Sequence, residues 1–419
     1  MASERRCIPA SEFCASVRDG THDSPKPVQN GRKLVTSRHL TTGRLDLSDA
    51  YLISEEDFEA INKRSKVDRW DVLISMIGTV GEPCLIKEEP DFAIKNIGLF
   101  KTKSEADGKW LYYVLRSDEA QQNIRAQSRG TTQQYIPLGA LRDLPILVTE
   151  DPGEQKAIAA VLGALDDKIE LNRRMNATLE AMARALFQSW FVDYDPVRAK
   201  LDGTRIAGVD ETTAALFPAH LEDSPLGKVP VGWRILRFAD ILTPHSVRVG
   251  EDSVPEFSAT VTGLSSRDER FKKQLSKSQS KNKRIVEGDL VFGFSREVIN
   301  FGLMREPVGA VSPVYEVFKI DSSKIEPELL ERLFRFNMPY YMDILKPGAR
   351  EGKPIDRDYL LRKHLLVPDI AVQRAFLATI QPWTDKIKAN EAESRTLATL
   401  RDTLLPKLLS GELSVTPEN

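Results

Sequence analysis

The chain has few cysteines and no long hydrophobic run. Cys7, Cys14 and Cys84 are the only cysteines among 419 residues, and their spacing fits neither a disulfide framework nor a zinc site. No apolar run approaches the roughly 20 residues that span a bilayer, and the N-terminus lacks the apolar segment of a secretory signal. We therefore expect a cytoplasmic protein with reduced thiols, no bound metal and no membrane partner.

The sequence motifs of common catalytic sites are also missing. There is no GxxxxGK[ST] phosphate loop and no GxGxxG cofactor loop, and the five histidines are scattered without an HExxH grouping. Glu351 and Lys353 have the spacing of some nuclease carboxylate–lysine pairs, but no suitably placed acid precedes them. These absences predict a chain that is not an enzyme and binds no cofactor of its own.

Net charge does not mark the chain as a nucleic-acid binder. Its 59 basic and 61 acidic residues give a formal charge of −2, whereas binding through phosphates favours a basic surface. The basic residues are unevenly distributed, however, because eight of them lie in residues 267–284 beside only two acids. This segment is either a phosphate-binding element or a solvated surface loop.

The chain repeats itself with an offset of 218 residues. The tripeptide at 167–169 returns at 385–387, and Asn172 returns as Asn390. An aspartate followed by three apolar residues at 71–74 returns at 289–292. Self-similarity of this kind predicts a tandem duplication of one fold, and 419 residues exceed one ordinary domain.

Each copy begins with short β-like runs interrupted by Gly and Pro and ends in a long helical stretch. We predict an α+β protein with two α/β domains. The predicted boundaries are 1–150 for the first domain, 151–195 for the first helical region, 196–230 for a linker, 231–368 for the second domain and 369–419 for the second helical region.

Both helical regions carry apolar residues at alternating steps of three and four, which is the spacing of a coiled-coil seam. Asp151 is the expected N-cap of the first helix, with Pro152 at its first position, and Gly411 is the expected end of the second. Pro382 and Pro406 are expected to kink or break the second helix. The predicted seam residues are Ile158, Leu162, Leu165, Ile169, Asn172, Leu179, Leu186, Ile387, Asn390, Leu397 and Leu404.

We expect the two helices to pair as an antiparallel coiled coil with pseudo-twofold symmetry and one domain at each end. Asn172 and Asn390 favour this pairing, because one buried polar position can fix register; the alternative is that each helix packs on its own domain. A helix of about 25 residues spans roughly 38 Å, close to one turn of B-DNA. Helix length would then set the distance between two half-sites. Residues 150–172 hold six acids against two lysines, which favours protein partners over phosphates.

Several stretches together resemble the paired conserved regions of type I restriction-modification specificity subunits. The matching stretches are RDGTH at 18–22, GTTQ at 130–133, EQKAI to LDDKI at 154–169, SWFVD at 189–193, LEDSPLG to PVGW at 221–233, and LPKLLSGEL at 405–413. The second copy departs from the pattern at 348–355, where its residues differ from the GTTQ loop of the first copy.

The resemblance implies a non-catalytic subunit whose two target recognition domains, separated by the helical pair, read a bipartite site in double-stranded DNA. It implies two methyltransferase subunits that use S-adenosylmethionine, and restriction/motor subunits that use ATP and Mg, as partners. Two alternatives remain open: a coiled-coil scaffold that binds no DNA, and a stand-alone DNA methyltransferase or nuclease with degenerate motifs.

The candidate DNA-binding residues combine side chains that read base edges with side chains that hold phosphates. Arginine and glutamine can pair with guanine and adenine edges, whereas lysines mainly hold phosphates. The candidates are Arg129, Gly130, Thr131, Thr132, Gln133, Lys272, Lys273, Lys277, Lys281, Lys283, Arg284, Arg350 and Lys353.

Overall fold

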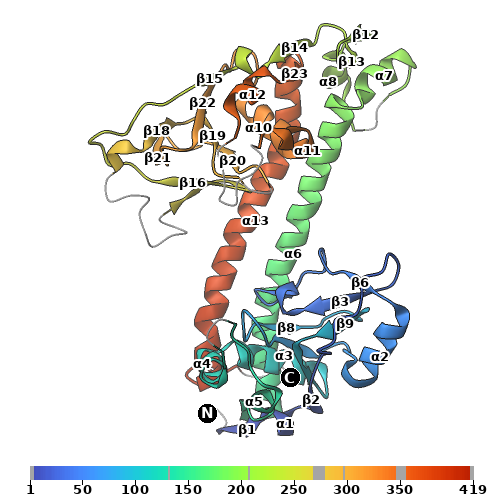
Figure 1. Cartoon of the computed structure of the whole chain (residues 1–419), viewed down its shortest axis with the longest axis vertical. Coiled ribbons are helices and arrows are strands. Elements are labelled where there is room, and N and C mark those ends of the chain that lie inside the picture. Colours follow the sequence, from blue (N-terminus) through green and yellow to red (C-terminus); the bar gives the residue numbers. More distant parts are fainter. Residues whose placement is uncertain are drawn as a thin grey trace. The chain divides into compact units, whose positions relative to one another are not determined.

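The computed structural model describes residues 4–130, 133–205, 208–267, 279–295, 298–345 and 355–415. The chain forms two compact units. Unit 1 comprises Met1–Arg174 and Ala389–Asn419, and unit 2 comprises Met175–Lys388. Two long helices, α6 (Pro152–Phe191) and α13 (Ile370–Ser410), each contribute one end to unit 1 and the other end to unit 2; both are seen in Figure 1.

Unit 1 is built on a four-stranded antiparallel sheet in the order β2-β10-β7-β8. Its strands are β2 (Ser16–Asp19), β10 (Ile97–Lys101), β7 (Val72–Ser75) and β8 (Pro83–Leu85). Side chains alternate between the two faces of β7, and both faces are covered. Val72 and Ile74 pack in one core with Trp110 of α3 (Glu105–Arg116), while Leu73 packs in a second core with Val35.

Unit 1 contains further strands and short helices besides this sheet and α3. They are the sheet β6 (Leu52–Ile53), β3 (Arg32–Thr36) and β9 (Phe92–Lys95); the pairs β1 (Arg5–Pro9) with β11 (Pro145–Thr149) and β4 (Leu40–Thr41) with β5 (Arg44–Leu45); the helices α1 (Ala10–Phe13), α2 (Glu55–Ser65), α4 (Asp118–Gln127) and α5 (Leu138–Arg142); and the 3-10 turn η1 (Ser37–His39).

Unit 2 repeats this plan with the sheet order β15-β22-β19-β20. Its strands are β15 (Leu242–Pro244), β22 (Glu316–Ile320), β19 (Leu290–Phe292) and β20 (Phe301–Leu303). Leu290 and Phe292 pack with Phe334 of α10 (Pro327–Phe336), and Val291 packs in a separate core on the other face of the strand.

The described residues of unit 2 also form four two-stranded pairs and several short helices. They are β12 (Leu221–Ser224) with β13 (Gly227–Pro230), β14 (Arg234–Arg237) with β23 (His364–Val367), β16 (Phe257–Thr260) with β17 (Gly263–Ser266), β18 (Lys283–Val286) with β21 (Val308–Val311), α7 (Asp195–Leu201), α8 (Glu211–Ala215), α11 (Met338–Tyr341), α12 (Arg357–Arg362), η2 (Phe238–Asp240), η3 (Gln279–Lys281) and η4 (Met342–Ile344). The expected linker at 196–230 thus contains helices and a hairpin.

Residues that are 218 positions apart in the sequence occupy equivalent positions in the two sheets. Val72 pairs with Phe100 and with Leu85 in unit 1, and the residues 218 positions later, Leu290, Phe318 and Leu303, pair in the same way in unit 2. The offset changes toward the start of each copy. In the outer ladder, for example, the partner of Thr149 is Arg5 and the partner of Val367 is Arg234, an offset of 229. The duplication predicted from the sequence is confirmed from β7 and β19 onward.

The start and end signals of the long helices are those expected. The carboxylate of Asp151 accepts the amide N–H of Gly153 at 2.8 Å, and that of Asp369 accepts the N–H of Ala371 at 2.8 Å. Gly411 follows the last residue of α13 with φ +81°, a conformation that glycine adopts at little cost.

The expected breaks at Pro382 and Pro406 do not occur, because α13 runs unbroken through both residues. A proline removes one backbone hydrogen bond and crowds the carbonyl group four residues earlier. Both prolines lie on the exposed side of α13, and so do Ala378 and Asp402, whose carbonyl groups lose their donors. Water can satisfy those carbonyls, and helices bend most easily with the solvent side convex.

Candidate nucleic-acid interface

In unit 1, three loops meet at one edge of the four-stranded sheet. Because β10 is antiparallel to both β2 and β7, the ends of β2 and β7 lie at the same edge as the start of β10. The residues after β2, the turn after β7 and Asn96, just before β10, therefore lie at this edge. Strands in a sheet are about 4.8 Å apart, so the loops that follow β2 and β7 are separated by roughly 10 Å, close to the width of the DNA major groove.

Residues 129–130 and 133–136 join this edge through backbone hydrogen bonds. The N–H of Gly78 donates to the carbonyl of Gln134 at 3.0 Å, and Arg129 and Tyr135 exchange two bonds of 2.8 Å each. The side chains of Arg129, Gln133 and Tyr135 are exposed. The structure thus brings Arg129, Gly130 and Gln133 together at the sheet edge, while Thr131 and Thr132 lie outside the described residues.

Gly130 is required by the geometry of this loop. Its φ is +95°, and an added Cβ would lie 2.3 Å from the carbonyl oxygen of Gln133. A side chain at this position would therefore move the backbone that presents Gln133.

The RDGTH motif forms a polar cluster at the same edge. The ring nitrogens of His22 hydrogen-bond the Asp19 carboxylate at 3.0 Å and the Asn96 side-chain oxygen at 2.8 Å. The guanidinium of Arg64 donates to the other oxygen of Asp19 at 2.9 Å. Asp19 is nearly buried, but 66% of the His22 side chain and 60% of the Arg64 side chain are exposed. The cluster therefore exposes the His22 ring and the Arg64 guanidinium to solvent at this edge.

Unit 2 has an equivalent edge where β15 and β19 end and β22 begins. His245 follows β15, the stretch from Gly293 to Ser295 follows β19, and Tyr315 precedes β22. The rings of Phe294 and Tyr315 meet edge to face, with centroids 5.9 Å apart.

In the described part of the basic segment at 267–284, some cationic side chains are bonded to protein groups and others face solvent. Lys283 donates to the Tyr315 carbonyl at 2.5 Å, and its burial lowers the pKa of the ammonium. Arg284 pairs with Asp252 at 2.5 Å, whereas Lys281 is exposed. The candidates Lys272, Lys273, Lys277, Arg350 and Lys353 lie outside the described residues.

The helix pair in unit 1 meets at the two asparagines that the repeat makes equivalent. The side-chain amide of Asn172 donates to Glu393 at 2.8 Å, to Ser394 at 3.3 Å and to the carbonyl of Asn390 at 3.4 Å. Asn172 and Asn390 are both buried. Closer to the N-terminus of α6, Asp166 contacts Arg401 of α13. Residue 166 thus lies beside residue 401, whereas residue 172 lies beside residue 390. The two helices are therefore antiparallel in this unit.

The other predicted seam residues are buried or half-buried. Ile158 and Leu162 are fully buried in the core of unit 1, together with Leu405 and Leu408. The half-buried positions are Leu165, Ile169, Leu179, Leu186, Ile387, Leu397 and Leu404.

Most acids of the first helix are paired within unit 1. Asp166 accepts Arg401 at 2.5 Å and the hydroxyl of Tyr113 at 2.8 Å, and burial together with this carboxylate raises the pKa of Tyr113. Glu154 pairs with Arg5 at 2.9 Å, and Glu170 pairs with Arg173 at 2.6 Å. The acidic composition that favoured a protein-binding helix is therefore largely neutralised by bonds inside the unit.

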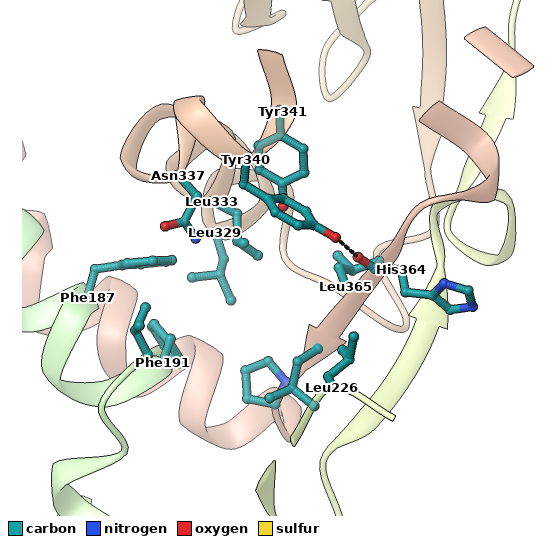
Figure 2. A pocket seen from close by; sticks show the side chains of 13 residues that line it. Phe187, Phe191, Leu226, Leu329, Leu333, Asn337, Tyr340, Tyr341, His364 and Leu365 are labelled. Atoms are coloured by element: carbon teal, nitrogen blue, oxygen red, sulfur yellow. Dashed lines mark hydrogen bonds between the residues drawn. The ribbon is translucent and has the colours of Figure 1, made fainter. Parts of the chain in front are cut away.

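Unit 2 contains a pocket of about 310 Å³ between the end of α6, α10, α11 and β23. Figure 2 shows the rings of Phe187, Phe191 and Tyr340 around it, with the Tyr340 hydroxyl 3.5 Å from the His364 carbonyl. Its lining is aliphatic and aromatic apart from Asn337 and His364. The pocket suits an apolar group, and its lining contains no carboxylate, lysine or arginine.

The described residues contain neither a metal-binding cluster nor a membrane-spanning helix. No group of three or more His, Cys, Asp or Glu side chains in the described ranges is arranged to hold a metal ion. Within the same ranges, no helix is long and apolar enough to cross a membrane.

Comparison with known proteins finds chains and structures similar to this one. The model for the type I restriction modification DNA specificity domain matches residues 27–181. The specificity subunit of the MjaIX type I restriction enzyme from Methanocaldococcus jannaschii is 26% identical, over 73% of this chain and 69% of its own length. That of the HindI enzyme from Haemophilus influenzae is 25% identical, over 73% and 77%. In fold, the chain resembles the crystal structure of a type I S subunit from M. genitalium, with a TM-score of 0.54 and 14% identity over 97% of this chain and 96% of that one. The resemblance seen in the sequence motifs is confirmed.

Proposed function

We propose that this chain belongs to the type I specificity subunits and is the DNA-reading subunit of a restriction-modification complex. Unit 1 reads one half of a bipartite site in double-stranded DNA, and unit 2 reads the other. The chain itself performs no chemistry: methyltransferase subunits carry S-adenosylmethionine, and restriction/motor subunits carry ATP and Mg.

The observation that carries this proposal is the repeated sheet edge. Each unit presents loops at the edge where the first and third strands of the same four-stranded sheet end, and the DNA specificity domain match covers most of unit 1. The loops differ in sequence between the copies while the registers agree, as expected if the sheet is a common scaffold and the loops read different bases.

The long helices are proposed to bind the methyltransferase subunits. Leu171 of α6 and Leu400 of α13 are 53% and 45% exposed, although leucines on a helix of an isolated protein usually face a core. Exposed leucines on both helices of the pair suit packing by further helices. We also propose that the lengths of α6 and α13 set the unread spacer between the half-sites.

Fluorescence anisotropy with labelled duplexes separates this function from the alternatives. The chain, alone and with its methyltransferase subunits, is titrated with a pool of random duplexes at two salt concentrations. DNA binding that weakens with salt and strengthens with the partner subunits is expected. A complex that forms but binds no DNA would support the scaffold alternative, and methylation or cleavage by the chain alone would support the enzyme alternative.

A further inference from the structure

The two copies of the sheet differ sharply at one residue of the DNA-facing edge. The repeat aligns Met76 of unit 1 with Phe294 of unit 2, since both follow strands of the same register. Met76 is 5% exposed and packs in the core of unit 1, whereas Phe294 is 41% exposed. Ser295, the next residue, is the one turned inward, with 5% exposure. Unit 2 therefore places an aromatic ring outward where unit 1 buries an aliphatic chain.

The ring is held in place by its neighbours. The carbonyl of Phe294 accepts the side-chain amide of Asn300 at 2.6 Å, and the hydroxyl of Ser295 accepts the backbone N–H of Asn300 at 2.9 Å. The ring also stands at 89° against Tyr315. A side chain that is ordered before binding loses little entropy when it meets a ligand.

Two basic residues, Lys283 and Arg248, are linked to Tyr315, the residue beside the ring. The ammonium of Lys283 is bonded to the carbonyl of Tyr315, the residue that supports Phe294. Arg248, which is exposed, is bridged to Lys283 through the backbone. Lys283 is occupied by its bond to Tyr315, but Arg248 is exposed and available to a phosphate. An exposed apolar ring at a loop edge with an exposed arginine suits DNA, where apolar groups lie in the groove between rows of phosphates.

We infer that Phe294 makes an apolar contact with thymine methyl groups in the half-site that unit 2 reads. The thymine C5-methyl is the apolar group that the major groove offers, and a sheet edge with loops roughly 10 Å apart matches that groove. This inference rests on the proposed function. It adds the residue and the base atom through which unit 2 selects sequence.

The test removes the two partners of the contact separately. The complex of the full chain with its methyltransferase subunits is first used to select its preferred duplex from a random pool. Binding is then measured for wild type and Phe294→Ala, on that duplex and on the same duplex with deoxyuridine in place of each thymidine of one half-site. Replacing thymidine with deoxyuridine deletes only the C5-methyl group of each base. One buried methyl group corresponds to about a fourfold change in affinity.

In the wild-type complex, deoxyuridine in one half-site is expected to weaken binding about fourfold for each thymine contacted. In Phe294→Ala the same replacement has no effect, and the selected sequence changes at that half-site only. Phe294→Leu retains part of the effect because it keeps an apolar side chain. Leu226→Ala is the matched control: Leu226 is 49% exposed on the β12–β13 hairpin of the same unit, and its loss leaves the deoxyuridine effect intact.

The outcomes separate this inference from the proposed function. A wild-type complex that selects no sequence would overturn the proposed function. A selective wild-type complex in which deoxyuridine and Phe294→Ala act additively, or not at all, would overturn the role of Phe294 alone. Amide hydrogen exchange of unit 2 shows whether each variant retains the fold.

Discussion

Asp166 is predicted to be the most important charged residue in the packing of α6 against α13 in unit 1. Its carboxylate accepts Arg401 at 2.5 Å, Tyr113 at 2.8 Å and Arg116 at 3.4 Å, and its side chain is 15% exposed. Asp166→Asn keeps the shape but removes the charge, so two largely buried arginines are left facing a neutral amide.

The expected cost follows from the burial of these groups. Breaking a fully buried ion pair costs about 3–5 kcal/mol. Here Arg401 and Arg116 keep 12% and 20% exposure, and both contact Asp402, which is 60% exposed. Solvent and this second carboxylate compensate in part, so we expect a loss of about 2–3 kcal/mol.

The adjacent residue supplies the control. Asp167 pairs with Lys87 at 2.5 Å, but the two side chains are 62% and 43% exposed, and exposed pairs contribute about 0–1 kcal/mol. Hydrogen exchange of the α6 peptide in a urea series measures the opening free energy of this helix in each variant. Equal effects of Asp166→Asn and Asp167→Asn, or none for Asp166→Asn, would refute the reasoning.

Three further predictions concern the loops and the helix surface. Gly130→Ala is expected to lower discrimination at one half-site by about tenfold, since it displaces Gln133; selection from random duplexes should show the other half-site unchanged. Lys281→Ala is expected to reduce the slope of log affinity against log salt by about 0.9, because Lys281 is assigned to a phosphate contact. Lys283→Ala should instead lower the unfolding midpoint in urea, because Lys283 is bonded to the Tyr315 carbonyl. A larger slope change for Lys283→Ala than for Lys281→Ala would show that Lys283 makes the phosphate contact. Two nearby arginines lower the pKa of Glu170 from 4.5 to about 2, so its charged form stabilises the fold above pH 4.5 and this contribution is lost as the pH falls toward 2. The stability difference between wild type and Glu170→Gln, measured by urea unfolding, should therefore shrink across that range, and a constant difference would contradict the assigned pKa.

The parts of the fold that periodic apolar patterns encode could be predicted from the sequence. The 218-residue offset anticipated that Val72 and Leu290 occupy the same register, and the seam spacing anticipated that Asn172 lies beside Asn390. Both patterns reflect burial, which repeats along the chain and leaves a readable signal.

The details that depend on three-dimensional surroundings could not be predicted. Local chemistry predicts that a proline breaks a helix. At Pro382, however, the carbonyl of Ala378 that loses its donor is on the exposed side of the helix, where water can bond to it. From the sequence, the acids of the first helix indicate a charged surface. Asp166 is instead paired with Arg401, which lies 235 residues away in the sequence, so local composition could not predict the pairing. The outward turn of Phe294 depends on the bonds of Ser295 and Asn300, which no periodicity encodes.

Methylation-sensitive sequencing of DNA modified by the reconstituted complex tests the central claim most directly. Wild-type complex is expected to methylate adenines in one bipartite motif with two fixed half-sites and an unread spacer, and Gly130→Ala and Phe294→Ala are expected to relax different halves of that motif. A continuous motif, or a single half that both variants alter, would contradict the assignment of one half-site to each unit.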